Sequence, residues 1–253
     1  MRPAAKAVLI GRALSARMRE ARRAIVAEAL GTALLVATVV GSGIMGSRLS
    51  NGNVGLALLA NSIATGAVLY VLITLLAPIS GAQFNPCVTW LLERHRPRPP
   101  LILAQIVGGM AGAIAAHLMF DLPALSSAAT VRTGPGQWLS EGVATFGLML
   151  TICLGVRHAP RAVPALVACW IVAAYWFTAS TSFANPAVTL ARALTGSFAG
   201  IRWVDVPAFL IAQSVGALLG QLTALHLTGD TENESDHLAQ PGLRHLAQDA
   251  GDP

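Results

Sequence analysis

The chain has 253 residues, of which 54% are hydrophobic and 11% are charged, and its mean hydropathy is +0.61. A soluble domain is about one quarter charged, so this composition excludes an ordinary soluble protein and indicates an integral membrane protein. The formal net charge of +5 does not indicate a nucleic-acid partner, because the basic residues lie in the end segments and short loops, where they act as topology signals.

Six apolar runs are long enough to cross the roughly 30 Å of hydrocarbon in a bilayer. Two further apolar pieces, near 85–93 and 185–193, would each rise only about 13 Å as a helix, which is half of that thickness. We expect two half-helices that enter from opposite faces and span the membrane together. The predicted fold is all-α, a polytopic membrane protein with two re-entrant half-helices and six transmembrane helices near 24–47, 54–77, 101–120, 138–156, 162–180 and 207–227.

Three parts are predicted along the chain: a basic N-terminal segment over 1–23, a membrane domain over 24–227 and an acidic tail over 228–253. The N-terminus has no cleaved signal peptide pattern, because the apolar run after the basic residues is too long. The tail holds six of the 12 acidic residues and has no periodic apolar pattern, so we expect it to be disordered.

The basic residues are distributed unequally between the two sides of the membrane. Thirteen of the 17 Lys and Arg residues lie on the side of both chain ends, and four lie on the other side, namely Arg48, Arg132, Arg192 and Arg202. By the positive-inside rule, both termini are predicted to be cytoplasmic. The three cysteines form no metal-binding pattern and need no disulfide, as expected for a multi-pass protein of the inner (cytoplasmic) membrane. No metal or cofactor is predicted.

A similar ten-residue motif occurs twice, as SGAQFNPCVT at residues 80–89 and as STSFANPAVT at residues 180–189. Two other features also repeat: a Glu lies near the start of the first and fourth spans, and an Ala-Gln pair lies near the start of the third and sixth. The repeats cover about 24–120 and 138–227. Each holds three spans, and an odd number forces the second copy to run upside down. The pattern predicts an inverted repeat with its functional site at the two interrupted segments.

Each Asn-Pro pair can begin its half-helix, since Asn is a strong N-cap and Pro suits the first helical position. Ordinary capping is the plain alternative, but it does not explain two inverted copies with matched flanks. Facing half-helix N-termini would place two positive dipole ends at the membrane midplane. The amides of Asn85 and Asn185 would then donate to a passing neutral solute, and cations would be repelled.

Glu28 and Glu141 are the two acidic residues inside the predicted spans. A carboxylate in hydrocarbon is expensive and marks function or a bundle-interior pair. A proton relay competes with a structural role. Their equivalent places in the two repeats favour structural support, in which each carboxylate accepts backbone N–H groups of a loop that leads to a half-helix.

The double Asn-Pro-Ala-type motif, the six spans and the Glu in spans one and four resemble the major intrinsic protein family, the aquaporins and aquaglyceroporins, over about 24–227. The resemblance implies a passive pore in every subunit of a homotetramer. It also implies that Asn85 and Asn185 are the central donors and that Glu28 and Glu141 hold the two re-entrant loops.

The chain departs from the family pattern at three places. The first motif, Asn85-Pro86-Cys87, ends in Cys rather than Ala, which puts a thiol near the narrow region. The second motif keeps Pro186 and Ala187, but Val188 follows where the family usually has Arg. Gapless counting from the motifs to the places that set selectivity in the family gives a small, uncharged filter without an Arg, made of Thr65, Ala173, Ser182 and Val188. A shift of one residue would replace Ala173 with Ala174.

A water-only pore needs a tight, polar ring, whereas the small side chains of the predicted filter indicate a wide ring. We therefore expect a passive channel for water and small neutral solutes, such as glycerol-like or urea-like molecules or undissociated metalloid hydroxides such as arsenous acid. Two alternatives stay open: an ion- or proton-coupled transporter, since inverted repeats with broken helices also build those, and a structural membrane protein with a vestigial pore. No enzyme is predicted, because no nucleophile–base set, metal-ligand spacing or phosphate loop is visible.

Overall fold

The computed structural model describes the backbone of residues 3–229 and the side chains of residues 15–229. Within that range the chain is helical and contains no strand. Six helices are long and apolar enough to cross a membrane, so the predicted polytopic all-α class and the six predicted spans are confirmed. The elements are α1 (Pro3–Leu49), α2 (Val54–Ser80), α3 (Pro86–Leu92), α4 (Arg98–Met119), α5 (Pro135–His158), η1 (Pro160–Ala162), α6 (Val163–Phe177), α7 (Pro186–Arg192), η2 (Trp203–Asp205) and α8 (Val206–Thr228).

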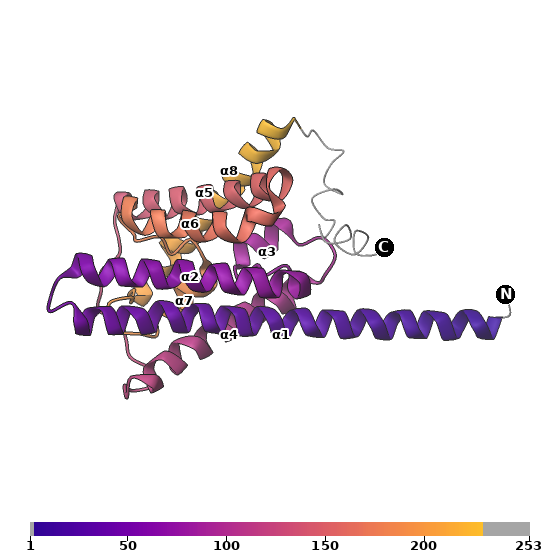
Figure 1. Ribbon diagram of the computed structural model, residues 1–253, viewed down its shortest axis with the longest axis horizontal. Coiled ribbons are helices and arrows are strands. Elements are labelled where there is room, and N and C mark those ends of the chain that lie inside the picture. Colours follow the sequence, from indigo (N-terminus) through magenta and orange to yellow (C-terminus); the bar gives the residue numbers. More distant parts are fainter. Residues whose placement is uncertain (1–2, 230–253) are drawn as a thin grey trace, which may run out of the picture.

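The first helix is longer than the predicted span. α1 runs without a break through the expected boundary at residues 23 and 24 and extends out of the helix bundle toward the N-terminus (Figure 1). Residues 15–30 contain no Gly or Pro and are rich in Ala, Arg and Glu, which are strong helix formers, so no local signal ends the helix there. The prediction of a disordered tail concerns residues 228–253, and 230–253 lie outside the described residues.

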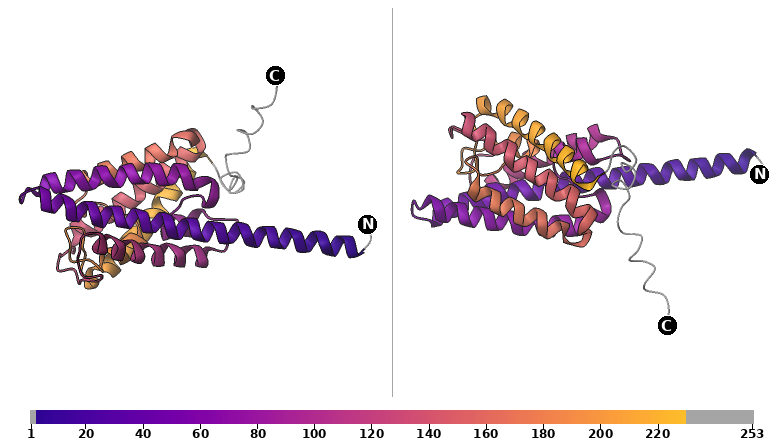
Figure 2. Two further views of the ribbon diagram at one scale, coloured as in Figure 1. Left: turned by 60° about the horizontal axis from the view of Figure 1, so that its bottom comes forward. Right: turned by 90° about the horizontal axis from the view of Figure 1, so that it is seen from above.

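The long helices form two groups of three. In the first group, α1 packs against α2 and α4, and in the second, α5 packs against α6 and α8, while contacts between α2 and α6 join the two groups. Both views in Figure 2 show the start of α1 and the end of α8 directed toward the same end of the bundle. This placement is expected for an even number of spans.

Glycines allow the closest contacts within each group. A Cβ atom at Gly108 of α4 would lie 2.2 Å from the carbonyl oxygen of Ala29 in α1. A Cβ atom at Gly216 of α8 would lie equally close, 2.2 Å, to the carbonyl oxygen of Gly142 in α5. Small residues let helix backbones approach in lipid, where van der Waals packing drives association. The two groups therefore use the same device at matching places.

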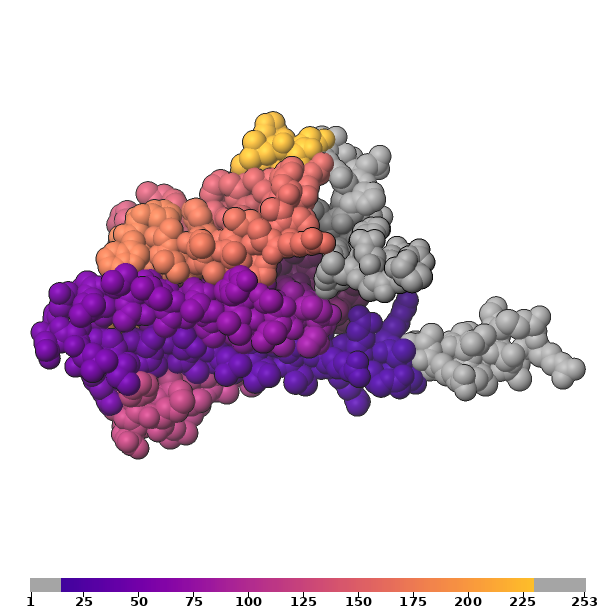
Figure 3. Space-filling model, in the orientation of Figure 1, coloured from indigo at the N-terminus to yellow at the C-terminus, as the bar shows by residue number. Residues whose placement is uncertain are grey.

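The two short helices lie inside the bundle, where each contacts a long helix of the other group. α7 packs against α4 and α1, α3 packs against α8 as well as α4, and α3 and α7 touch each other. The outer faces are apolar, and Figure 3 shows α2 and α6 side by side along one of them. The large hydrophobic side chains exposed there include Ile63, Val71 and Leu75 of α2 and Trp176 and Phe177 of α6.

Candidate functional site

The two Asn-Pro pairs meet end to end. Asn85 and Asn185 are the N-caps of α3 and α7, in extended backbone, and the Oδ1 of each accepts the N–H of the residue two positions later. The Asn85 Nδ2 donates to the Ala184 carbonyl oxygen at 2.8 Å, and the Asn185 Nδ2 donates to the Phe84 carbonyl oxygen at 2.7 Å. An amide NH2 carries two N–H donors. Each Asn therefore donates one N–H to the opposite loop, and its second N–H donates to none of the described residues.

The loops before the two Asn residues share an unusual backbone. Ala82 and Phe84 have φ of 48° and 48°, and the equivalent Ser182 and Ala184 have φ of 49° and 50°. A left-handed backbone costs a non-glycine residue on the order of 1–2 kcal/mol, so surrounding contacts must hold these loops. Both loops adopt the same strained shape at positions one and three before the Asn.

Glu28 supplies the contacts that hold the first loop. Its carboxylate accepts the backbone N–H groups of Gln83 at 3.0 Å and Phe84 at 2.6 Å. It also accepts the hydroxyl of Ser80 at 2.6 Å and the Nε2 amide of Gln105 at 2.7 Å. Glu28 is 0% exposed, and these four donors account for how a carboxylate can be held in the interior.

Glu141 is placed in the same way in the second repeat. Its carboxylate accepts the backbone N–H groups of Phe183 and Ala184, both at 2.9 Å, and the Nε2 amide of Gln213 at 2.7 Å. Gln213 also donates to the hydroxyl of Thr189 on α7 at 2.8 Å. The inverted repeat is therefore visible in individual hydrogen bonds, and the carboxylate fixes the loop that leads to Asn185.

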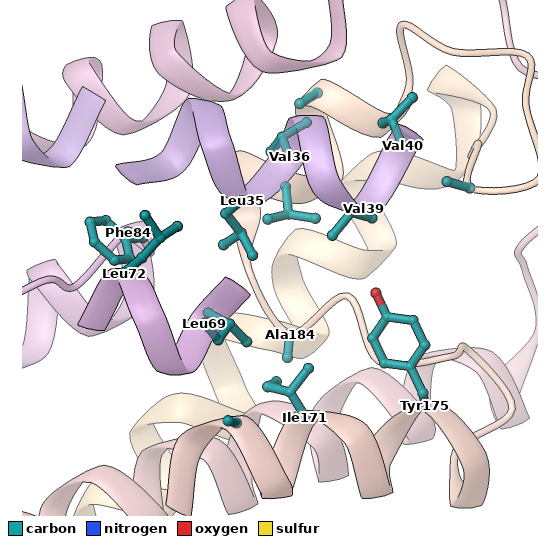
Figure 4. Close-up of a cluster of buried hydrophobic side chains, with 14 of the residues drawn as sticks. Leu35, Val36, Val39, Val40, Leu69, Leu72, Phe84, Ile171, Tyr175 and Ala184 are labelled. Atoms are coloured by element: carbon teal, nitrogen blue, oxygen red, sulfur yellow. The ribbon is translucent and has the colours of Figure 1, made fainter. Parts of the chain in front are cut away.

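Three of the four predicted filter residues are buried near the second loop. Thr65, Ser182 and Val188 are 3%, 3% and 5% exposed. The Thr65 hydroxyl lies 3.2 Å from the hydroxyl of Tyr175. The Ser182 Oγ is buried and has no hydrogen-bond partner among the described residues. Val188 belongs to the same cluster of buried side chains as Tyr175 and Ala184, toward which Leu69 and Ile171 point (Figure 4).

The prediction that Ala173 lines the constriction is wrong. α6 buries Ile171, Ala174 and Tyr175, whereas Ala173 is exposed. With 3.6 residues per turn, Ala173 lies on the face of α6 opposite to Ile171. The gapless count crosses a non-helical segment after Phe177, and such a segment does not preserve helical register.

Ala174, which a shift of one position would select, is 0% exposed, and the sequence analysis did not select the buried residue next to it, Tyr175. It is 3% exposed and carries its hydroxyl to Thr65. The burial pattern of α6 places it on the inner face with Ile171. The helical period of span five could have indicated this inner face, whereas a count from the motif could not.

The Cys87 side chain packs between helices, two residues after Asn85, whose Oδ1 accepts the Cys87 backbone N–H. Cys87 is 7% exposed and belongs to a cluster of buried side chains with Met149 and Cys153 of α5 and Ala217 of α8. Pro86 and Pro186 each occupy the first position of their short helix, and Ala187 is 0% exposed. The first motif thus directs its third residue into packing between helices.

Two arginines that the sequence analysis counted only as topology signals lie beside the second loop. Arg132, from the segment between α4 and α5, is 8% exposed, and Arg192 at the end of α7 is 2% exposed. Their guanidinium carbons lie 4.9 and 3.4 Å from the ring centroid of Phe183. Burial lowers the pKa of Arg132 from its ordinary value, and the nearby Glu141 carboxylate opposes that shift. Within the described residues no group of three or more His, Cys, Asp or Glu side chains could hold a metal ion.

Comparison with known proteins places this geometry in context. The model of the family described as "Major intrinsic protein" matches residues 15–172. The chain is 57% identical over 201 residues to "Aquaglyceroporin AqpS" of Rhizobium meliloti, covering 78% of this chain and 86% of that protein. It is 32% identical over 243 residues to "Aquaporin AqpM" of Methanothermobacter thermautotrophicus, covering 81% and 97%. It is also 32% identical over 241 residues to "Aquaporin NIP2-1" of Oryza sativa subsp. japonica, covering 88% and 77%.

Proposed function

The chain belongs to the major intrinsic protein family and forms a channel for water and small neutral solutes such as glycerol, and from that premise we propose how it selects them. We propose that the selectivity filter consists of Thr65, Tyr175, Ser182 and Val188. We further propose that it passes glycerol-like molecules and undissociated metalloid hydroxides such as arsenous acid.

The residue after the second motif carries this proposal. Val188 offers neither charge nor hydrogen bonds, whereas an Arg there would bring a bulky fixed cation with several donors into the ring. Val188 lies in the same buried cluster as Tyr175, whose hydroxyl lies 3.2 Å from that of Thr65, and the buried Ser182 Oγ has no partner among the described residues. A solute with several hydroxyl groups on a small carbon or metalloid centre matches a filter that is polar on one side and apolar on the other.

The midplane suits neutral solutes for a separate reason. The N-termini of α3 and α7 face each other, and each helix end carries a partial positive charge. The remaining amide N–H donors of Asn85 and Asn185 are available to a solute oxygen. Cations would have to pass two positive ends, so we propose that this pair of asparagines passes neutral solutes and repels cations.

The hydrogen bonds of the two buried carboxylates favour a passive channel over a proton-coupled transporter. Coupling needs titratable groups along the path, and Glu28 and Glu141 are the acids within the spans predicted from the sequence. Both are engaged by backbone amides and a Gln side chain. We propose that they support the two loops and do not relay protons.

The orientation and assembly are also proposals. The excess of Lys and Arg on the side of the two chain ends supports cytoplasmic termini in an inner membrane. The side opposite the termini, where the segment between α4 and α5 lies, is then the outer side. Family membership supports a homotetramer with one pore in each subunit.

One panel of flux measurements tests the proposed function. The purified protein is placed in liposomes, and the fluxes of water, glycerol, urea and arsenous acid are measured against empty liposomes, with and without a pH gradient. We expect glycerol and arsenous acid fluxes well above the control and independent of the gradient, with no unitary current in planar bilayers. Water flux alone, flux that follows the pH gradient, or no flux at all would each contradict the proposal.

A further inference from the structure

Arg132 is attached to the segment that carries the second filter position. Its Nη1 donates to the Ser180 carbonyl oxygen at 2.9 Å and to the Thr181 hydroxyl at 3.4 Å, and its Nε donates to the Gly200 carbonyl oxygen at 2.9 Å. Its backbone N–H donates to Asp205 at 2.9 Å. These bonds join the segment between α4 and α5 to both ends of the second re-entrant region.

The inverted repeat provides an internal comparison for this arginine. In the first repeat, the Arg96 Nη1 donates to the carbonyl oxygen of Ser80 at 3.1 Å, and Ser80 is the equivalent of Ser180. Both repeats therefore have an arginine on the serine carbonyl at the start of the re-entrant loop. One arginine comes from the end of its own half-helix region, and the other comes from the segment between α4 and α5.

The two arginines differ in charge compensation. Arg96 forms ion pairs with Glu93 at 3.4 Å and Glu20 at 3.3 Å. Among the described residues the Arg132 guanidinium forms no ion pair, and the nearby Asp205 carboxylate accepts the side chain of Arg202 at 2.9 Å. Arg96 is thus paired directly with two carboxylates, whereas Arg132 has no direct carboxylate partner among the described residues.

Arg132 also lies close to the filter. The loop residues that it binds precede Ser182 directly, and its guanidinium lies 4.9 Å from the ring centroid of Phe183, which follows Ser182. Its Nε and Nη1 make these bonds, and its Nη2 donates to none of the described residues. A guanidinium is always charged in proteins and has five N–H donors, so this edge offers both a fixed charge and a free donor.

We propose that Arg132 is the fixed cation of the outer filter, supplied from the segment between α4 and α5, in place of the charge that Val188 does not carry. In this role, which rests on the proposed function, it raises the barrier to cations and donates a hydrogen bond to the oxygen atoms of entering neutral solutes. Its full charge exceeds that of either midplane helix end, because each of those carries only about half a charge.

The test measures how well the channel discriminates a small cation from a neutral solute. The full-length protein in liposomes is assayed for methylammonium and glycerol permeability, and their ratio is compared between variants at equal amounts of folded protein. Arg132→Gln should raise the methylammonium-to-glycerol ratio by about tenfold or more. Arg132→Lys should keep the ratio close to the native value, because the charge remains although the paired hydrogen bonds do not.

A second variant removes the charge without removing the arginine. Thr181→Asp places a carboxylate next to the Arg132 Nη1, as Glu93 stands beside Arg96, and Asp tolerates the φ of 60° at residue 181 better than most residues. This variant should also raise the ratio by about tenfold. It decides the question if Arg132→Gln does not fold.

Arg48→Gln is the matched control, because it removes one positive charge from the same side of the molecule, from an arginine that contacts Phe120 rather than the second loop. Its ratio should stay close to native. The proposal is overturned if Thr181→Asp keeps the native ratio. It is also overturned if Arg132→Lys raises the ratio as much as Arg132→Gln does, because Arg132 would then only hold the loop in place. Absence of glycerol flux from the native protein would instead refute the proposed function.

Discussion

The side-chain amide of Asn85 donates a hydrogen bond to the carbonyl oxygen of Ala184, the residue directly before the second Asn-Pro pair. Asn185 returns the same bond to Phe84. The loop of each repeat is thus closed by a donor from the other repeat, across 99 and 101 positions of the chain. Neither re-entrant loop can reach its final shape alone, so the site and the association of the two repeats form together.

Replacing Glu28 or Glu141 with Ala should destabilise the folded protein. Each change leaves two backbone N–H groups and a Gln amide without their acceptor in the interior, at a cost on the order of 1–3 kcal/mol per group. Thermal unfolding in detergent measures the effect. Glu20→Ala is the control, because that side chain is 67% exposed. Unchanged stability together with flux that is lost only outside a narrow pH range would indicate a proton relay.

Gly216→Ala should also lower the thermal stability, for a steric reason. The added Cβ would lie 2.2 Å from the carbonyl oxygen of Gly142, so α8 would have to move away from α5. Gly136→Ala is the matched control, because nothing lies within 4 Å of its Cβ position, and there a gain of about 0.4–1 kcal/mol is expected. Equal unfolding temperatures for the two variants would show that the α5–α8 contact is looser than described.

Much of the fold could be predicted from residue patterns. The apolar runs are long and the two motifs are specific, so the six spans and the half-helices near 85–93 and 185–193 were expected close to their observed places. The length of α1 was not, because the first span was predicted from residue 24 and residues 1–23 were predicted only as a basic segment. A basic sequence such as residues 15–23 can continue a helix beyond the membrane.

The site was harder to predict than the fold. The positions of Asn85, Glu28 and their counterparts depend on motif spacing within a repeat, and counting works there. Ala173 failed because its distance from Asn185 includes a non-helical segment. No sequence pattern indicated the position of Arg132. Its side chain is held mainly by backbone carbonyl groups, and because every residue has such a group, they leave no mark in the sequence.

Tyr175→Phe should reduce the flux of hydroxyl-bearing solutes relative to water. The change removes the hydroxyl that lies 3.2 Å from Thr65 and leaves the ring in place, so one filter hydrogen bond is lost. A fall in the glycerol-to-water flux ratio of roughly two- to tenfold is expected from the usual value of one hydrogen bond. Tyr70→Phe is the control, because Tyr70 is 50% exposed on α2. If the two variants have the same ratio, Tyr175 does not contribute to the filter.

Val188→Arg should make the channel more selective for water. The new side chain would bring a second fixed cation and several donors to the ring that Thr65, Tyr175 and Ser182 share. Solutes wider than water should lose passage first, so the fluxes of glycerol and arsenous acid should fall more steeply than the water flux. The measurement is the glycerol-to-water flux ratio in liposomes that hold equal amounts of folded protein, because a buried unpaired Arg also costs stability.

Val188→Met separates the effect of size from the effect of charge at this position. Met adds length without charge or strong hydrogen bonding, so it should lower the glycerol flux less than Arg does. If Val188→Arg folds well and keeps the native ratio, Val188 is not at the constriction and the proposed filter is wrong. If Met and Arg reduce the ratio equally, the filter selects by width alone, and the polar contacts of Tyr175 and Ser182 do not set the choice of solute.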